Sequence, residues 1–396
     1  MKIISCAGFG GTGSSIITDL FRECSNVYSV GGNGLEFFFL HEPDGIKDLE
    51  NALVEGHRFK VDFAIKRFKK LAENLYYNNP SGSSYKNFFN GKFLDITNDY
   101  LNSLGIIEWK EGWWHRIFEN KDKKFHRFIK NMRFQKYVEK YYSLYEPDSW
   151  KPVYTGYATQ YYCNINKNDF IGKTKVYLEK LFSEINTTAE YLLFDQLFPP
   201  TDTEEYIKYF DHAKAIVVER DPRDLYFVNK VYWGCGFMPF SKVETFIVWY
   251  KKTRNIVKAS KNVLTVKFED FLYKTEDTIK SVLSFIGLSE QQHDKKRTFL
   301  FPEKSITNTQ LIKRIRLRNN YFQMEIIKDI SLIETQLKDY LYNFNELPQS
   351  ETINQKEQKF IYSQIYNMTN KEPFIISFFV TIPKLFKHIL RKVRGQ

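Results

Sequence analysis

Residues 2–15 read Lys2-Ile3-Ile4-Ser5-Cys6-Ala7-Gly8-Phe9-Gly10-Gly11-Thr12-Gly13-Ser14-Ser15, and Ile16-Ile17-Thr18-Asp19-Leu20-Phe21 follow. This order predicts a buried strand, a glycine-rich turn and a helix. The free backbone N–H groups and the dipole of such a helix start favour a phosphate. Glycines let the backbone approach it closely, and hydroxyl groups add donors. The stretch therefore predicts an anion-binding loop built from Gly10, Gly11, Thr12, Gly13, Ser14 and Ser15.

A second segment far along the chain has the same character. The apolar run Ala215-Ile216-Val217-Val218-Glu219 leads into Arg220-Asp221-Pro222-Arg223-Asp224. Arg220 stands at the carboxyl end of a predicted strand, where an open α/β sheet places its ligands, and its guanidinium can fork onto a phosphate. Taken alone, the segment is also open to a second interpretation, a surface ion-pair cluster. Taken together, the two segments predict one anionic nucleotide held at both ends.

The glycine loop alone leaves other interpretations open. Gly8-x-Gly10-x-x-Gly13 also fits the dinucleotide fingerprint, which expects an acidic residue at the end of the second strand, about 20 residues further on. Glu36 lies near that distance, but residues 31–34 separate it from the predicted strand at 27–30. A kinase-type loop needs Gly-Lys-Ser/Thr, which is absent. A glycine-rich turn without a ligand is a further alternative.

At these residues the chain resembles the sulfotransferases that use 3′-phosphoadenosine-5′-phosphosulfate (PAPS). Thr12-Gly13-Ser14-Ser15 is similar to that family's 5′-phosphosulfate loop, and Arg220 to Asp224 match its Arg-Asp-Pro-Arg-Asp motif, whose arginine binds the 3′-phosphate. The order and spacing agree over about residues 1–55 and 190–320. The downstream segments that continue the resemblance are Val263–Phe271 with Phe268-Glu269-Asp270, Ile279–Leu288, and Phe301-Pro302-Glu303-Lys304-Ser305 with Asn308.

The resemblance implies an α/β fold, P-loop-like, with three layers: a central parallel sheet, helices on both faces and a long, mostly helical insertion. It implies PAPS as cofactor, with 3′-phosphoadenosine-5′-phosphate (PAP) as product, and no metal. The nucleotide would be held by the loop residues 10–15 and by Arg220, Asn229, Lys304, Ser305 and Asn308.

Two positions depart from the family pattern. The basic residue that usually precedes the loop is replaced by Gly11, and the serine expected eight residues after Arg220 is replaced by Val228, with Asn229 next to it. We therefore expect a rebuilt donor site, in which Lys304, Lys313 or Arg223 replaces the missing cation. A protein that binds the nucleotide without efficient transfer is the alternative.

The acceptor side needs a base that takes a hydroxyl proton. Family members that act on glycans place a Glu just after the second strand, and Glu36, in the run Gly34-Leu35-Glu36-Phe37-Phe38, is the predicted base. Burial among phenylalanines would raise its pKa. His41 is the second candidate, with a purely structural loop histidine as its alternative. Asp195 and Gln196 end another predicted strand and are expected to line the cleft, although capping explains them equally well.

Length and composition fit one α/β domain over residues 1–345 with an aromatic-rich insertion at about 57–188. Helical periodicity is expected around Phe63–Leu75 and Phe125–Tyr142. Aromatic rings there can stack on sugar faces, although most are expected to be core. The net charge of +11 predicts anionic partners, whereas no nucleic-acid-binding signature is present.

The four cysteines, Cys6, Cys24, Cys163 and Cys235, show no metal-binding spacing, and Cys6 and Cys24 are expected to be buried thiols. No secretory signal or spanning run is found, which predicts a cytoplasmic protein. After a polar linker at 346–373, residues 374–396 form a basic amphipathic tail, which predicts either an anionic membrane surface or packing on the fold.

The predicted function is transfer of a sulfuryl group from PAPS to a hydroxyl of a glycan or lipid-linked saccharide, with Glu36 as base. The alternatives are a non-catalytic nucleotide- or glycan-binding protein of the same fold and an NAD(P)-dependent Rossmann oxidoreductase.

Overall fold

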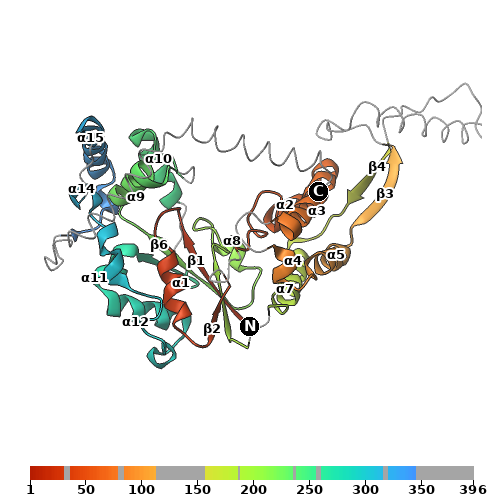
Figure 1. The fold of residues 1–396 in the computed structure, drawn as a ribbon. Coiled ribbons are helices and arrows are strands. Elements are labelled where there is room, and N and C mark those ends of the chain that lie inside the picture. The colour runs from red at the N-terminus through yellow and green to blue at the C-terminus, as the bar shows by residue number, and fades with distance from the viewer. Residues whose placement is uncertain are drawn as a thin grey trace, which may run out of the picture. The chain divides into compact units, whose positions relative to one another are not determined.

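A computed structural model describes the chain over residues 1–30, 36–78, 84–112, 157–185, 188–234, 238–255, 260–314 and 320–344. These residues form two compact units (Figure 1). Unit 1 comprises Met1–Ser29, Ala189–Glu204 and the described part of Lys214–Gln396. Unit 2 comprises the described part of Val30–Thr188, together with Glu205–Ala213. The predicted insertion was expected to begin at about residue 57. Unit 2 begins earlier, at Val30, and so also includes residues 30–56.

The central sheet is parallel and has the strand order β2-β5-β1-β6-β7. Its strands are β1 (Lys2–Gly8), β2 (Val27–Ser29), β5 (Tyr191–Asp195), β6 (Ala213–Glu219) and β7 (Val263–Lys267). Register places Cys6 of β1 opposite Asp195 of β5, and Glu219 of β6 opposite Lys267 of β7. All four carboxyl ends of β1, β5, β6 and β7 therefore meet at one edge of the sheet.

This strand order separates the fold from the dinucleotide-binding alternative. In a Rossmann sheet the second strand pairs with the first, but here β5 lies between β1 and β2. The acidic candidate is also misplaced, because β2 ends at Ser29 and Glu36 lies in unit 2. The α/β fold with a central parallel sheet is confirmed, and the glycine loop follows the middle strand, as expected for a P-loop-like arrangement.

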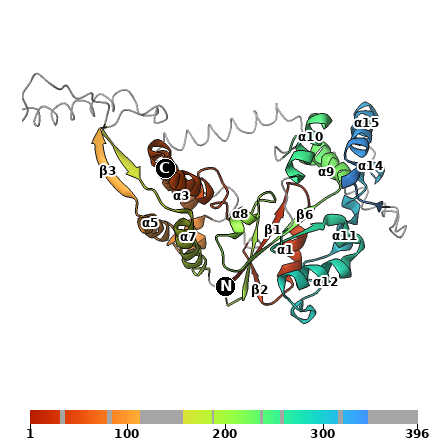
Figure 2. The same cartoon turned by 180° about the vertical axis from the view of Figure 1, so that it is seen from behind.

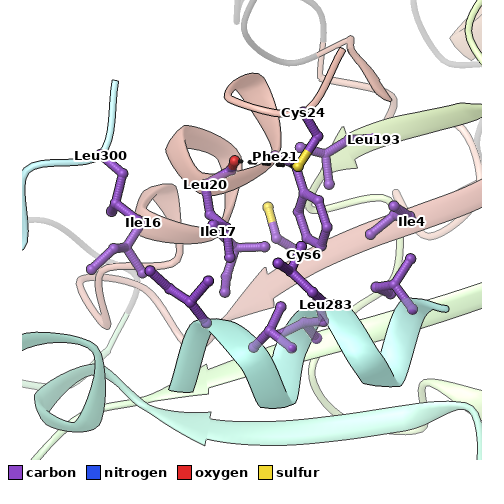
Figure 3. Close-up of a cluster of buried hydrophobic side chains, with 14 of the residues drawn as sticks. Ile4, Cys6, Ile16, Ile17, Leu20, Phe21, Cys24, Leu193, Leu283 and Leu300 are labelled. Carbon is purple, nitrogen blue, oxygen red and sulfur yellow. Dashed lines mark hydrogen bonds between the residues drawn. The ribbon is translucent and has the colours of Figure 1, made fainter. Parts of the chain in front are cut away.

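Alternate residues of the buried strands point to opposite faces, and helices cover both. On one face, Ile4 and Cys6 of β1 pack against α1 (Ser15–Arg22) and α12 (Thr275–Ile286); Figure 3 shows Ile17 and Leu20 of α1 in this core with Leu283 of α12. On the other face, Ala7 and Val217 contact Trp249 of α10 (Val243–Arg254). The apolar runs identified in the sequence thus form the core between three layers.

The remaining helices of unit 1 come after strands β6 and β7 in the chain. They are α9 (Pro222–Val228), α11 (Phe268–Tyr273), α13 (Pro302–Ser305), α14 (Leu311–Arg314) and α15 (Asn320–Gln336), with a π-helix at Asn229–Trp233 and short 3-10 turns at Glu290–Gln292, Ile306–Asn308 and Lys338–Tyr340. Helices α9, α10, α14 and α15 gather in one group in both views (Figures 1 and 2). Their shared core includes Leu225, Phe246, Leu311 and Ile330.

Unit 2 is helical with one hairpin. Its helices are α2 (Ile46–Glu55), α3 (Arg58–Asn78), α4 (Tyr85–Phe88), α5 (Phe93–Ser103) and α7 (Lys167–Phe182), with α8 at Glu204–Ile207. The aromatic content forms its core: the ring of Phe37 stacks on Tyr85 at 5.5 Å between centroids and meets Phe182 edge-on at 5.2 Å. The helix expected around Phe63–Leu75 is confirmed within α3, and the one expected at 125–142 lies outside the described residues.

The hairpin was not predicted. Strand β3 (Ile107–Gly112) pairs antiparallel with β4 (Tyr157–Tyr162), so that Trp109 lies opposite Gln160. Pairing between segments so far apart in sequence leaves no local signal, because each strand by itself is short. The described part of the insertion is therefore helical with a hairpin.

Cys6, Cys24 and Cys163 are free and buried, as expected for the first two, while Cys235 lies outside the described residues. None of the helices in the described ranges has both the length and the hydropathy that crossing a membrane requires. The polar linker and the basic tail at 346–396 also lie outside those ranges.

Candidate functional site

The carboxyl edge of the sheet in unit 1 brings together residues from four strand ends. The glycine loop follows β1, Gln196 follows β5, Arg220 follows β6, and Phe268 follows β7. In open α/β sheets, ligands bind outside the carboxyl ends of the strands. This edge is therefore the candidate site.

The glycine loop adopts a backbone that only glycine accepts readily. Gly10, Gly11 and Gly13 have φ values of 83°, 69° and 83°, in the left-handed region. Gly8 is also held by packing, since a Cβ there would lie 2.3 Å from the Thr12 hydroxyl oxygen. Backbone segments that contain residues with positive φ can form concavities lined by N–H groups, which suit an anion. The loop thus has the geometry expected of a phosphate cradle.

The loop ends at the start of α1. Ser14 is the N-cap residue, and the first helical bonds run from Ile16 N to Gly13 O at 3.1 Å and from Ile17 N to Ser14 O at 3.0 Å. The positive end of the helix dipole therefore lies at Ser14 and Ser15, beside the cradle. This dipole adds to the attraction for an anion.

Gln196 joins the two ends of the glycine loop. Its Oε1 accepts from the backbone N–H of Gly8 at 3.3 Å, and its Nε2 donates to Ser14 Oγ at 3.2 Å. Its own N–H donates to Cys6 O at 2.8 Å, and its φ of 54° is rare for a residue with a side chain. Backbone strain of this kind persists only where the surroundings fix it, often at functional sites.

Asp195 lies next to it and turns toward the strand. Its carboxylate accepts from the Cys6 thiol at 3.1 Å, and burial raises its pKa. Asp195 and Gln196 were expected to line an acceptor cleft. Asp195 contacts Cys6 of β1, and Gln196 bonds to both ends of the glycine loop. That they line an acceptor cleft stays a prediction.

Arg220 is buried against the same loop, with 6% of its surface exposed. Its Nη1 donates to Gly11 O at 3.0 Å, and its Nη2 donates to Asn308 O. The guanidinium lies 5.3 Å from the centroid of the Phe268 ring, and its Nε has no hydrogen-bond partner in the part of the chain that the structure describes. Arg220 therefore ties the glycine loop to the loop at Asn308.

Three buried carboxyl groups surround this guanidinium. Burial lowers the pKa of Arg220 below its usual value. The charges of Asp224, Glu269 and Asp221 oppose this effect only in part. Asp224 accepts from Gln310 N and Leu311 N, both at 2.8 Å, and burial raises its pKa to about 6. Glu269 accepts from Asp221 N at 2.9 Å, and burial raises its pKa to about 8. Sequence reasoning gave Asp224 and Glu269 no individual role; their place in the Arg-Asp-Pro-Arg-Asp and Phe-Glu-Asp segments was the only signal.

The structure accounts for the departure at Gly11. A Cβ at this position would lie 3.0 Å from Nδ2 of Asn229, and φ is already positive, so a longer residue is strained here. Asn229 itself is buried, opens the π-helix and donates to Leu225 O at 2.9 Å. Asn229 thus borders the loop, and its contact with a nucleotide stays a prediction. A π-helical turn is a frequent feature of functional sites.

The three cations considered as replacements differ in their surroundings. Arg223 is engaged: it forks onto Asp221 and also pairs with Glu334 at 3.1 Å. Lys304, on α13, lies 3.7 Å from the Phe301 ring centroid, and Lys313 lies 3.4 Å from Gln310 Oε1. Lys304 and Ser305 belong to α13, which packs against α11, the helix that begins at Phe268. Lys313 belongs to α14, which packs against α9 and the 3-10 turn at Ile306–Asn308, so both lysines stay candidates.

Glu36 and His41 belong to unit 2 and are described within it. The hydroxyl of Tyr85 holds the backbone around Glu36 in place. It donates to Glu36 O at 3.3 Å and accepts from Phe38 N at 3.0 Å. His41 follows on the same turn, with its N–H donating to Phe38 O at 3.0 Å and its ring edge-on to Tyr206 at 6.4 Å. Both side chains are half-buried. Their roles as base stay predictions.

No group of three or more His, Cys, Asp or Glu side chains among the described residues is arranged to hold a metal ion. No family profile matches the sequence, and no curated protein matches it.

Several solved structures are similar. A sulfotransferase domain from the curacin biosynthetic pathway is 13% identical, with a TM-score of 0.37 over 88% of this chain and 98% of that one. The sulfotransferase domain of the Synechococcus PCC 7002 olefin synthase is 12% identical, with a TM-score of 0.33 over 84% and 94%. Retinol dehydratase in complex with androsterone and the inactive cofactor PAP is 14% identical, with a TM-score of 0.28 over 89% and 84%. Identities and scores are low, so a function must be supported by this chain's own residues.

Proposed function

We propose that this protein is a PAPS-dependent sulfotransferase that acts on a hydroxyl group of a saccharide acceptor. The observation that carries the proposal is the contact between Arg220 and the glycine loop. A buried guanidinium, an anion cradle and the start of α1 lie within one connected set of hydrogen bonds at the carboxyl edge of the sheet. Two separate anion-binding elements suit a nucleotide that carries phosphate at both its 5′ and 3′ positions.

The residues present fit such a nucleotide. Two buried polar atoms at the loop, Thr12 Oγ1 and Arg220 Nε, have no hydrogen-bond partner among the described residues. Backbone N–H groups of the loop would hold the 5′ end, while Arg220 with Ser305 and Asn308 would hold the 3′ end. PAPS, when bound, supplies an activated sulfuryl group.

The chain's own groups would stabilise charge and position the acceptor. The loop N–H groups and the dipole of α1 stabilise negative charge at the 5′ end, which lessens the need for the missing lysine. Lys304 is the cation we propose to add to them. Glu36 would remove the proton of the acceptor hydroxyl, with His41 as the alternative base.

Transfer from sulfur-labelled PAPS to a panel of saccharides tests this proposal. Glu36→Gln should keep PAP affinity and lose transfer by at least about a hundredfold, the usual contribution of a general base. His41→Gln is the matched comparison, and it should leave transfer within a few-fold. The reverse result would assign the base to His41.

A non-catalytic nucleotide-binding protein is the second candidate, and Gly11 is the observation that favours it. Such a protein would bind PAP and show no transfer to any acceptor. Lys304→Ala helps to separate the two cases, because it should slow transfer only if the chain is an enzyme.

A further inference from the structure

A groove lies between α2 and α3 in unit 2, with a volume of about 560 Å³. We propose that this groove binds a neutral saccharide unit of the acceptor. The inference rests on the function proposed above and names where the acceptor is held. The residues that carry it are Asp44, Asp48, Asn51, Phe59, Phe63 and Arg67, all of which line the groove.

The size and lining of the groove suit a small organic ligand. Binding pockets commonly measure about 300–1,000 Å³ and combine apolar walls with a few polar groups. Here Phe59 and Phe63 stand one helical turn apart on α3, so both rings line the same side of the groove. Ring faces at this spacing can pack against the apolar faces of a pyranose.

Three carboxylates and two cations line the groove, and two of the carboxylates are paired with the cations. Arg67 Nε pairs with Asp44 at 2.9 Å, and Lys60 pairs with Glu55 at 2.6 Å. Asp48 accepts from the backbone N–H of Asp44 at 2.8 Å. The lining therefore keeps one negative charge in excess, at Asp48, which disfavours an anionic ligand. A wholly apolar ligand would desolvate the ion pairs at a cost.

A neutral ligand rich in hydroxyl groups fits this lining. Each hydroxyl both donates and accepts, so it can bond to paired carboxylates and to the remaining N–H groups of Arg67 without separating the ion pairs. The exposed Asn51 amide on α2 adds one more donor and acceptor group. Such a ligand is a saccharide.

The groove also adjoins the turn that carries His41. Asp44 has a φ of 70°, and the turn is closed by bonds from Gly45 N to Glu42 O at 2.8 Å and from Ile46 N to Phe39 O at 2.9 Å. One turn thus holds both a candidate base and a wall of the groove. A strained residue at such a place is typical of ligand sites.

The test applies the full-length protein to a printed array of neutral and uronic-acid-containing oligosaccharides. We expect the native protein to bind neutral oligosaccharides on the array. Phe63→Ala and Asn51→Ala should each lower the affinity for them at least tenfold. Asn51 is exposed, so that variant folds even if Phe63→Ala does not. Val176→Ala is the control, because Val176 is 66% exposed on α7 of the same unit and away from the groove lining.

Three outcomes overturn the inference: no neutral oligosaccharide retained, acidic ones alone retained, or unchanged affinity in both groove variants. PAP titration of the same proteins separates this inference from the proposed function. PAP binding without saccharide binding removes the groove and keeps the nucleotide site. Saccharide binding without PAP binding removes the sulfotransferase function and identifies a saccharide-binding protein.

Discussion

Arg220 Nη1 donates to the carbonyl oxygen of Gly11 at 3.0 Å, which joins the end of β6 to the glycine loop after β1. The second arm of the same guanidinium reaches Asn308 O. One buried cation thus connects three segments that are far apart in sequence. Nucleotide affinity and the conformation of the loop should therefore change together when these contacts are altered.

Gly13 should tolerate no side chain. A Cβ there would lie 2.6 Å from the Phe268 ring, at a φ of 83°. Gly13→Ala should lower the free energy of unfolding by about 2 kcal/mol or more and weaken PAP binding. Denaturant unfolding and PAP titration measure both effects.

Gly287→Ala is the matched control for Gly13. Gly287 has a φ of 96° at the end of α12, but no atom lies within 4 Å of its Cβ position. It should lose only about 1 kcal/mol and keep full PAP affinity. Equal losses in the two variants would show that Phe268 does not constrain the loop.

Gln196 should affect PAP binding by orienting the hydroxyl group of Ser14. Because Ser14 Oγ accepts from Gln196 Nε2, its own proton remains available for a bound anion. Gln196→Gly relieves the positive φ while removing the side chain, so PAP affinity should fall about tenfold without loss of stability.

A double-mutant cycle measures this coupling. In a Ser14→Ala background, the same change at Gln196 should cost much less affinity, with a coupling free energy of about 0.5–1 kcal/mol. Strictly additive losses would mean that Gln196 does not orient Ser14.

Glu269 should make stability depend on pH. Burial raises its pKa from 4.5 to about 8, so the folded protein holds a proton that the unfolded chain has lost between these values. The contribution of Glu269 to the free energy of unfolding should therefore be fully present below about pH 4.5 and be lost as pH rises toward 8. Asp224, raised from 3.8 to about 6, contributes with the same sign.

Glu269→Gln tests this assignment. The glutamine keeps a carbonyl oxygen for Asp221 N but cannot ionise, so its stability relative to the native protein should increase as pH rises from 4.5 to 8. Thermal unfolding across this range measures it. A stability difference that is the same at every pH would show that Glu269 does not titrate there.

The sheet and the main loop could be predicted from local sequence. The apolar runs that lead into Gly8, Asp195 and Arg220 proved to be strands, because a strand buried on both faces leaves a continuous apolar signal. The run before Phe268 also proved to be a strand, half-buried at the edge of the sheet. Glycine at 10, 11 and 13 likewise marks a turn with positive φ.

Interactions between distant segments could not be predicted in this way. The bond from Asp221 N to Glu269, the two contacts of Gln196 and the hairpin at Trp109 each join residues whose separation in sequence leaves no periodic trace. The role expected of Arg223 also depended on its surroundings, since Asp221 and Glu334 engage it. Local pattern gave the site's position, and tertiary contacts decide what each side chain does.

The central claim is that unit 1 binds PAP through Arg220 and the glycine loop, and calorimetric titration of the purified protein with PAP tests it most directly. NAD and ATP serve as parallel ligands, with Arg220→Ala as the site variant and Lys280→Ala, which changes an exposed cation on α12, as control. We predict selective micromolar binding of PAP, weakened by roughly 2 kcal/mol, or about 30-fold, in Arg220→Ala alone. Absence of PAP binding, preference for NAD, or equal affinity in Arg220→Ala would contradict the account.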